Sequence, residues 1–412
     1  MLDNKKRDMT PFDMKKPPVK QRFFLVPAIW AASYVMTRKF GLKITKTNMK
    51  GIKPPYLVIS THQSYSDYYI TPLALFPHRA NYVSDMEGFA AFGDWLYRSI
   101  GCIGKRRFVT DFSVIKNVRH ALKNKQSVVI YPEARHSNAG TTSLLPKNLG
   151  KLVKFLNVPL VILSTHGSYL ASPFWDEERR RKTKMTAHLE CVYTAEELKN
   201  TDETEIQRVI EEKLSYDEYK WQYDNKVEIT FPGRTEGLHK VLYKCRSCHR
   251  EYGMKSEGSM LYCEGCGEKW EMNTYGQLIN NNETVHIPDW YEWERSEAEK
   301  DVEEKELNYS FYVRVEALPN EKGFVPLGEG ILTLDKEAFV LKLGDKEMTF
   351  PHRLRESVQT EYNYKERGQC IVLSDKDCCY YIYCDHEDFL PTKLQFIGEY
   401  LYSKLNLKKV DV

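Results

Sequence analysis

The sequence predicts an α/β domain with a mainly parallel sheet flanked by helices, then a small cysteine-rich module, then an all-β domain closed by a C-terminal helix. Three observations predict this order. Strand-like and helical segments alternate between residues 50 and 170, cysteines gather between 241 and 272, and short β-like runs follow from about 308. Because 412 residues exceed what one hydrophobic core usually organises, we expect several domains.

The first 40 residues combine a basic tail with an apolar run, "FFLVPAIWAASYVM", that ends at Met36. This run is too short to cross a bilayer, which needs about 20 apolar residues. No clear cleavage site follows it, so we interpret the segment as retained. Aromatic residues flanked by lysine and arginine are typical of a helix in a membrane interface. A first helix packed on the protein's own core explains the pattern equally well.

The α/β domain is expected over residues 41–235. Its clearest strands are expected at 56–60, 80–84, 127–131 and 159–163. Between them, "GFAAFGDWLYRSIG" and "DFSVIKNVRHALKNK" carry apolar residues at helical spacing. Such alternation implies crossover units and a mainly parallel sheet. Thr194 and Glu197 form a plausible capping box for the helical sequence that closes the domain.

A histidine and an aspartate stand five positions apart in "ISTHQSYSDYY", directly after the strand expected at 56–60. Catalytic groups gather at the carboxyl ends of parallel strands. On one continuous helix His62 and Asp67 would point about 140° apart. They can therefore meet if His62 precedes a helix and Asp67 lies in its first turn, where Asp67 would hold one imidazole nitrogen and leave the other as a base. A simple loop hydrogen bond is the alternative.

In order along the chain, "STHQSYSD", "GCIGKRR", "YPEARHS" and "NVPLVIL" resemble the four motifs of the glycerophospholipid acyltransferases, the lysophosphatidic-acid or 1-acyl-glycerol-3-phosphate acyltransferase family. The resemblance covers roughly residues 50–190. It implies transfer of a fatty acyl group from a thioester, on coenzyme A or acyl carrier protein, to a hydroxyl of a lysophospholipid or glycerol-phosphate acceptor. His62 would then be the general base, and Asp67 would orient its imidazole.

The same resemblance implies the residues that bind the substrate. Arg107 falls on the second-motif arginine, which binds phosphate, and Arg106 adds positive charge beside it. Glu133 falls on the third-motif glutamate, which helps to hold the polar head of the acceptor. The third-motif arginine position is His136 here, with Arg135 one place earlier, so the head group need not be simple lysophosphatidic acid. A solvated basic turn and a strand-end ion pair are the structural alternatives.

Ten cysteines without an export signal argue for metal or thiol roles and against a disulfide framework. Cys245, Cys248, Cys263 and Cys266 form two Cys-x-x-Cys pairs separated by fourteen residues. Two such turns can place four thiolates around one ion, so we predict a structural zinc ribbon at 241–272. Iron in a rubredoxin-like site stays an alternative, as do a redox dithiol and unrelated thiols.

The remaining sequence is expected to form an acidic connector at 273–306 and a small β domain at 307–412. Several strand candidates are followed by one amphipathic helix, an arrangement that resembles pleckstrin-homology or GRAM-type barrels. This resemblance of arrangement establishes no function.

The sequence therefore predicts a cytoplasmic acyltransferase, peripheral on the inner face of a membrane, with acyl carrier protein as one candidate partner. A catalytically inactive lipid- or protein-binding scaffold is the alternative, because the third motif is altered. With 60 basic and 57 acidic residues, the chain lacks the basic excess of a nucleic-acid-binding protein, so we expect no nucleic-acid partner.

Overall fold

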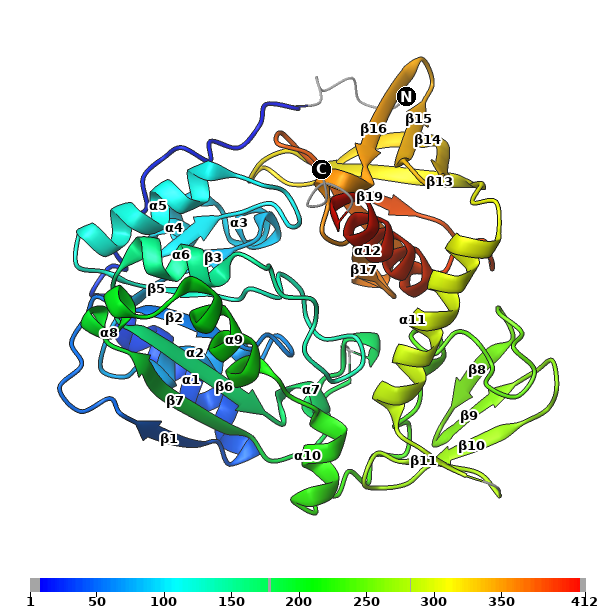
Figure 1. Cartoon of the computed structure of the whole chain (residues 1–412), viewed down its shortest axis with the longest axis horizontal. Coiled ribbons are helices and arrows are strands. Elements are labelled where there is room, and N and C mark those ends of the chain that lie inside the picture. The colour runs from blue at the N-terminus through cyan, green and yellow to red at the C-terminus, as the bar shows by residue number, and fades with distance from the viewer. Residues whose placement is uncertain (1–7, 177–178, 282, 408–412) are drawn as a thin grey trace.

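The computed structural model describes residues 8–176, 179–281 and 283–407, so the outer ends of the predicted N-terminal tail and β domain lie outside it. Three sheets follow one another along the chain (Figure 1). The first belongs to the α/β domain, the second carries the cysteines, and the third forms the C-terminal β domain.

The first sheet has seven strands in the order β1-β7-β6-β2-β5-β3-β4. Its neighbours are parallel except for β6 and β7, which are antiparallel, so the predicted mainly parallel sheet is confirmed. The strands are β1 (Lys43–Thr47), β2 (Leu57–Ser60), β3 (Ala80–Ser84), β4 (Cys102–Gly104), β5 (Ser127–Ile130), β6 (Leu160–His166) and β7 (Thr186–Tyr193).

Helices cover both faces of this sheet. Alternate residues of β2 face opposite sides, because successive side chains of a strand point in opposite directions. Val58 packs in one core with Ile70 of α2, and Ile59 packs in a second core with Val118 of α5. The helices of this domain are α1 (Val26–Thr37), α2 (Asp67–Leu75), α3 (Met86–Phe92), α4 (Asp94–Ser99), α5 (Phe112–Lys123), α6 (Leu149–Leu156), α7 (Ser168–Ala171), α8 (Ala195–Asn200), α9 (Glu203–Leu214) and α10 (Glu218–Asp224).

Two predicted helices are divided in the structure. The segment predicted as one helix from residue 88 is split into α3 and α4 by Gly93, whose φ of +78° lies in the region that favours glycine. The capping box of Thr194 and Glu197 is confirmed, but α8 ends at Asn200 and a new cap at Asp202 starts α9.

The second sheet is a five-stranded antiparallel sheet in the order β12-β11-β10-β9-β8, and it extends past the predicted end at residue 272. The stretch predicted as an acidic connector contains a long helix, α11 (Ile287–Glu304), whose Trp290 packs against Trp270 of the sheet. The strands are β8 (Met254–Glu257), β9 (Met260–Cys263), β10 (Lys269–Met272), β11 (Leu278–Ile279) and β12 (Thr284–Val285).

The third sheet is antiparallel, in the order β16-β15-β14-β13-β19-β18-β17, and α12 (Pro391–Leu407) follows it, as predicted. Among the described residues no strand pairing joins β16 to β17, so a closed barrel stays a prediction. The strands are β13 (Tyr309–Leu318), β14 (Val325–Leu334), β15 (Ala338–Leu343), β16 (Lys346–Pro351), β17 (Gln359–Glu361), β18 (Cys370–Ser374) and β19 (Cys379–Tyr383). Short 3₁₀ turns are η1 (Arg38–Phe40), η2 (Phe174–Asp176), η3 (Leu238–Lys240), η4 (His352–Leu354) and η5 (Tyr364–Glu366).

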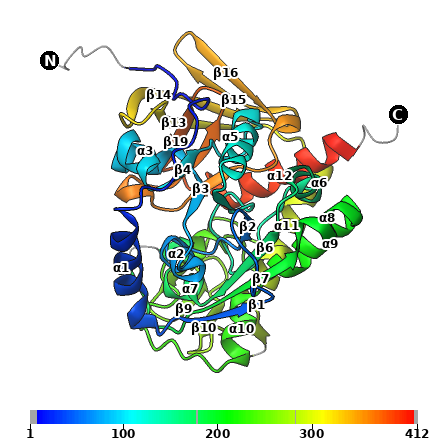
Figure 2. The ribbon, with the colours of Figure 1, turned by 90° about the vertical axis from the view of Figure 1, so that its left-hand side faces the viewer.

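The N-terminal segment, residues 8–20, links the first and last domains. It runs past α3 and α5 toward the strands of the C-terminal domain (Figure 2). Phe12 donates its backbone N–H to the carbonyl of Pro319, and its ring packs on Phe89 of α3 at 4.8 Å. Helix α1 then packs on α2, and Phe23 just before this helix and Tyr34 within it are exposed. Within the described residues, we find no helix with the length and apolar character needed to span a bilayer.

Candidate active site

His62 and Asp67 adopt the geometry that their spacing requires. His62 lies in the loop after β2, and Asp67 is the first residue of α2. Imidazole Nδ1 lies 3.3 Å from Asp67 Oδ2. Both side chains are buried, with 7% of the His62 side chain and none of the Asp67 side chain exposed. The Nε2 atom is thus left for a substrate, because Asp67 holds the other ring nitrogen.

Asp67 is fixed by four further hydrogen bonds. Its Oδ2 accepts the backbone N–H groups of Gln63 at 2.6 Å and Ser64 at 3.1 Å. Its Oδ1 accepts the hydroxyls of Ser168 at 2.9 Å and Thr165 at 3.5 Å. A carboxylate with this many donors is held in one orientation, so the imidazole that it contacts is oriented as well.

Glu133 holds the His62 loop in place through hydrogen bonds. Its Oε1 accepts the backbone N–H of His62 at 2.8 Å, and its Oε2 accepts the backbone N–H of Ser143 at 2.8 Å and the hydroxyl of Tyr216 at 3.1 Å. Only 1% of Glu133 is exposed. Burial raises the pKa of Glu133 to about 7, against these hydrogen bonds, which lower it. The contacts place Glu133 in a positioning role, and its predicted contact with a head group stays a prediction.

His136 lies beside His62, with ring centroids 4.4 Å apart. Burial and, to a lesser extent, the neighbouring His136 together lower the pKa of His62 to about 4, against the raising effect of Asp67. Burial likewise lowers the pKa of His136 to about 4. Both imidazoles are therefore neutral near pH 7, which is the state that a general base requires.

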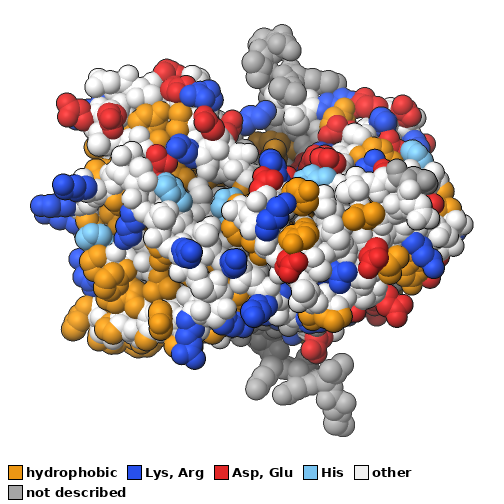
Figure 3. Space-filling model, turned by 90° about the horizontal axis from the view of Figure 1, so that it is seen from below, with side chains coloured by type: hydrophobic (Ala, Val, Ile, Leu, Met, Phe, Trp, Pro, Cys, Tyr) orange, Lys and Arg blue, Asp and Glu red, His pale blue; other side chains and the backbone are white. Residues whose placement is uncertain are grey.

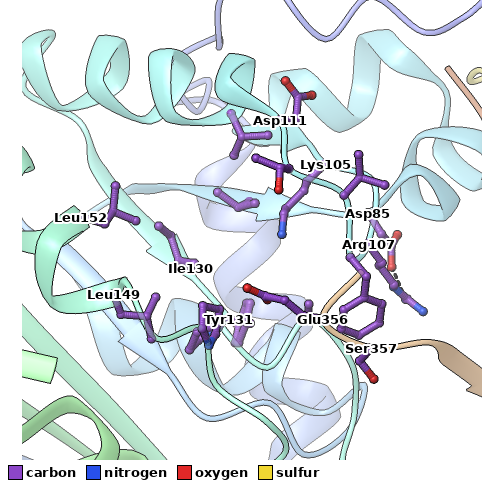
Figure 4. A pocket seen from close by; sticks show the side chains of 18 of the residues that line it. Asp85, Lys105, Arg107, Asp111, Ile130, Tyr131, Leu149, Leu152, Glu356 and Ser357 are labelled. Carbon is purple, nitrogen blue, oxygen red and sulfur yellow. Dashed lines mark hydrogen bonds and ion pairs between the residues drawn. The ribbon is translucent and has the colours of Figure 1, made fainter. Parts of the chain in front are cut away.

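A cavity of about 350 Å³ opens beside His62. One end is polar and contains Asp85, Lys105 and Arg107, while Ile130, Leu149 and Leu152 line the other end (Figure 4). The C-terminal domain closes part of the wall with residues from η4, from the segment after it and from α12, namely Arg353, Leu354, Glu356, Ser357 and Tyr402. The arrangement can hold a molecule with one polar and one apolar end against the imidazole.

Arg107 lines this cavity, but carboxylates surround it. It forms an ion pair with Asp85, and its Nη1 lies 3.8 Å from Glu87 Oε1 and 3.6 Å from Glu361 Oε1. Asp85 and Glu87 stand at the start of α3, whereas Glu361 ends β17 of the C-terminal domain. Nearby, Lys105 points into the cavity from the side opposite Glu356 (Figure 4).

The structure places the other two predicted arginines in contacts between domains. Arg106 donates to the backbone carbonyls of Pro319, Lys376 and Asp377, and only 2% of it is exposed. Arg135 donates to Ser357 and Val358 and forms a buried ion pair with Glu399 of α12. Neither residue lines the cavity beside His62, and substrate binding by Arg106 and Arg135 stays a prediction.

The four predicted metal ligands form one cluster. The Sγ atoms of Cys245, Cys248, Cys263 and Cys266 all lie within 4.8 Å of one another. Two of the separations, Cys245 to Cys266 and Cys248 to Cys263, are 3.7 Å. Thiolates at the usual zinc–sulfur distance of about 2.3 Å form a tetrahedron with edges of about 3.8 Å, so the cluster fits a tetrahedral ion.

Several residues that shape the site were missed in the sequence. Thr165 of β6 and Ser168 of α7 donate hydrogen bonds to Asp67, and Tyr216, in the segment after α9, donates one to Glu133. Asp85 carried a usable signal, since it directly follows the strand predicted at 80–84, as His62 follows the strand before it. Glu361 carried none, because its approach to Arg107 depends on packing between domains.

One comparison, with models of protein families, supports an acyltransferase domain. Residues 42–170 match the model of the family described as Acyltransferase. The chain is also similar to the solved structure of the 1-acyl-sn-glycerophosphate (LPA) acyltransferase PlsC from Thermotoga maritima, at 16% identity and a TM-score of 0.38. This similarity covers 46% of the present chain and 77% of that chain. No curated protein matches the chain in sequence.

The family match covers the part of the chain that holds the His62 site, and it supports an acyltransferase domain there. The match ends near the end of β6, so it includes neither the cysteine cluster nor the C-terminal domain.

Proposed function

We propose that the chain transfers a fatty acyl group from an acyl thioester to a hydroxyl of a lysophospholipid or glycerol-phosphate acceptor, a step of phospholipid biosynthesis. The thioester is carried by coenzyme A or acyl carrier protein. One observation carries the proposal, namely that the buried pair of His62 and Asp67 lies against a cavity with one polar and one apolar end.

His62 supplies the general base. Its Nε2 takes the proton of the acceptor hydroxyl while Asp67 stabilises the imidazolium at Nδ1. The hydroxyl oxygen attacks the thioester carbonyl carbon, and the carbon–sulfur bond breaks as the carbonyl re-forms. The thiol leaves with the proton returned by His62, so the products are the acylated acceptor and a free thiol. Holding both substrates beside one imidazole supplies much of the acceleration.

The apolar end of the cavity suits the acyl chain. It lies between α5 and α6 and is lined by Val114, Val118, Ile130, Leu149 and Leu152. Each methylene buried there contributes about 0.8 kcal/mol, so a chain of several carbons would be retained without any polar contact.

A membrane surface is the proposed source of the acceptor, with the protein peripheral on the cytoplasmic side. Hydrophobic side chains gather in one corner of the lower face, on the side where α1 lies, with lysine and arginine around them (Figure 3). Phe23, just before α1, is 75% exposed and Tyr34 of α1 is 63% exposed, and Arg22 lies over the ring of exposed Trp95 of α4. Aromatic and basic side chains together favour an interface with anionic lipid.

The cysteine cluster is proposed to hold one structural zinc ion. The four ligands lie in or next to β8 and β9. Two of them, Cys245 and Cys263, are buried. Four protein ligands leave no open position for a substrate, so the ion would stabilise the second sheet and play no part in acyl transfer. Metal analysis of the purified protein should give about one zinc per chain, and Cys263→Ser should lose it. Iron in place of zinc, or equal metal in both proteins, would contradict the assignment.

An inactive scaffold is the second candidate. The contacts that favour it are those of Arg107, Arg106 and Arg135, all of which are engaged by other residues of the chain. An assay of thiol release separates the two functions. The wild-type protein and His62→Ala are each given acyl-coenzyme A or acyl-acyl carrier protein with a panel of lysophospholipids. Acceptor-dependent thiol release that His62→Ala lacks supports the enzyme, and the same low release from both proteins supports the scaffold.

A further inference from the structure

We propose that the acceptor carries a head group without net negative charge, such as an ammonium-bearing phosphodiester, rather than a phosphomonoester. This inference rests on the proposed acyl transfer and narrows its acceptor class. Its basis is the set of carboxylates around Arg107, one of which comes from the C-terminal domain.

Arg107 is outnumbered by its partners. One guanidinium faces the carboxylates of Asp85, Glu87 and Glu361, so the group carries a net charge of −2 from one positive and three negative side chains. These four side chains are between 9% and 19% exposed, which limits screening by water. Burial raises the pKa of Asp85, but Arg107 outweighs this effect and holds the pKa below 3.8.

A phosphomonoester would have to take Arg107 from these carboxylates. It would bring about two further negative charges at neutral pH to a group that already has an excess of them. Each carboxylate displaced from Arg107 would be left poorly solvated and without its cation, which is unfavourable in a buried setting. The site therefore discriminates against that head group by repulsion.

Lys105 does not reverse this balance. Burial lowers the pKa of Lys105, and the two carboxylates that act on it electrostatically are those of Glu356 and Asp111. Both residues line the same cavity, and Glu356 comes from the C-terminal domain. The Lys105 cation is thus also matched by carboxylates within the chain, and Arg353, a further cation of the cavity wall, is exposed to solvent.

A second cavity, with a volume of about 670 Å³, borders Glu361. Its wall combines aromatic side chains with charges of both signs, namely Tyr65, Phe174, Trp175, Tyr362 and Tyr364, the carboxylates of Asp176, Glu236, Glu361 and Glu366, and the cations Arg179, Lys240 and Lys365. The ring of Tyr65 lies 4.6 Å from His136, which itself lies 4.4 Å from His62. Aromatic faces and carboxylates attract ammonium groups, while the three lysine and arginine side chains of this wall oppose them. The discrimination between head groups therefore comes from the carboxylates around Arg107.

Glu361 is therefore a specificity-determining residue that the C-terminal domain adds to the site. Its predicted effect is measured as the ratio of kcat/KM for two acceptors with the same acyl chain, lysophosphatidylethanolamine and lysophosphatidic acid. The wild-type protein should prefer the zwitterionic acceptor by about tenfold or more, since like charges at a recognition site are strongly unfavourable. A monoacylglycerol serves as the uncharged acceptor and should also be used in preference to lysophosphatidic acid.

Three variants test the assignment. Glu361→Gln removes one carboxylate and should lower the ratio about threefold or more, because each lost charge weakens the repulsion of phosphate. Glu87→Gln should act in the same direction from α3, which guards against a folding defect specific to Glu361→Gln. Glu347→Gln changes an exposed carboxylate on the β15–β16 hairpin and should leave the ratio unchanged.

The outcomes separate this inference from the proposed function. Transfer that depends on His62 but uses lysophosphatidic acid equally or better overturns the inference and leaves the proposed function standing. A zwitterionic preference that folded Glu361→Gln and Glu87→Gln both retain overturns the role of the carboxylates. Absence of transfer to every acceptor contradicts the proposed function itself, and the inference with it.

Discussion

The His62 loop and the motif arginines lie at the same edge of the first sheet but are held in different ways. His62 and Asp67 are fixed by neighbours within the α/β domain, such as Ser168 and Glu133. Arg106 and Arg135 are instead held by Pro319 and Glu399 of the C-terminal domain. A short spacing between two compact side chains determines how they lie relative to each other. The partner of a long arginine side chain is instead determined by tertiary packing.

The largest effect is expected at His62, and it should appear in rate and not in stability. His62→Asn keeps a donor near the position of Nδ1 for Asp67 but has no base at Nε2. General-base catalysis typically contributes about 10²–10⁴-fold, so kcat should fall by that factor. Thiol-release kinetics and thermal melting check this together. A large fall in Tm with intact specific activity would contradict the expectation that His62 acts on rate and not on stability.

Arg135 should show the opposite behaviour, with its main effect on stability. Arg135→Ala leaves Glu399 in a buried site with Arg295 as its remaining cation, which should cost about 3–5 kcal/mol. Urea unfolding measures this value. Arg208→Ala is the matched control, because its ion pairs are exposed and should contribute little to stability. Equal losses of unfolding free energy in both variants would show that the interdomain ion pair stabilises the protein no more than an exposed ion pair does.

Substitution of Glu133 should affect both rate and stability, because the hydrogen bonds of Glu133 hold the loop that carries His62. Glu133→Gln replaces one acceptor oxygen by a donor that faces the backbone N–H of His62 or Ser143. We expect a loss of about 1–3 kcal/mol in the free energy of unfolding, with a fall in kcat. Glu196→Gln, on the exposed side of α8, is the control. An unchanged stability with a raised KM for the acceptor would instead support the head-group role implied by the family resemblance.

The smallest effect concerns pH. With the pKa of His62 lowered to about 4 by burial, the acidic limb of kcat/KM should lie near pH 4 instead of near 6.5. Between these values the unfolded chain binds protons more readily than the buried His62 and His136, so the contribution of these two groups to stability falls as the pH is lowered from about 6.5 toward 4. Glu133 contributes in the opposite direction, because burial raises its pKa to about 7. Rate profiles are therefore restricted to pH values at which circular dichroism shows the native fold. An acidic limb of kcat/KM near pH 6.5 would show that the His62 imidazole is solvated.

Much of the fold follows from local pattern. The strands around residues 57, 80, 127 and 160 were predicted because continuous apolar runs mark buried parallel strands. Strands β1 and β7 were missed, since β1 is largely exposed at the edge and β7 alternates in burial as an antiparallel partner of β6. Helix α11 was missed because its many acidic residues obscure the spacing of buried residues such as Trp290 and Val302 in the sequence.

The site was predictable to the extent that it is local. The five-residue step from His62 to Asp67 and the paired cysteines both specify geometry within a few residues of chain. The surroundings of Arg107 were not predictable, because Glu361 lies far along the chain and reaches the site through the packing of another domain. A single sequence contains no periodic signal for such a contact.

The N-terminal segment has a consequence for how the chain reaches its native state. The amide of Asn320 donates to the carbonyl of Thr10, across 310 positions of sequence, and Phe12 packs in one cluster with Tyr364 and Cys370. A ribosome releases residues near 10 long before those near 320 exist, so this segment waits for its partners while the α/β domain assembles. Closing so long a loop is slow. We therefore expect its docking to be among the last events of folding.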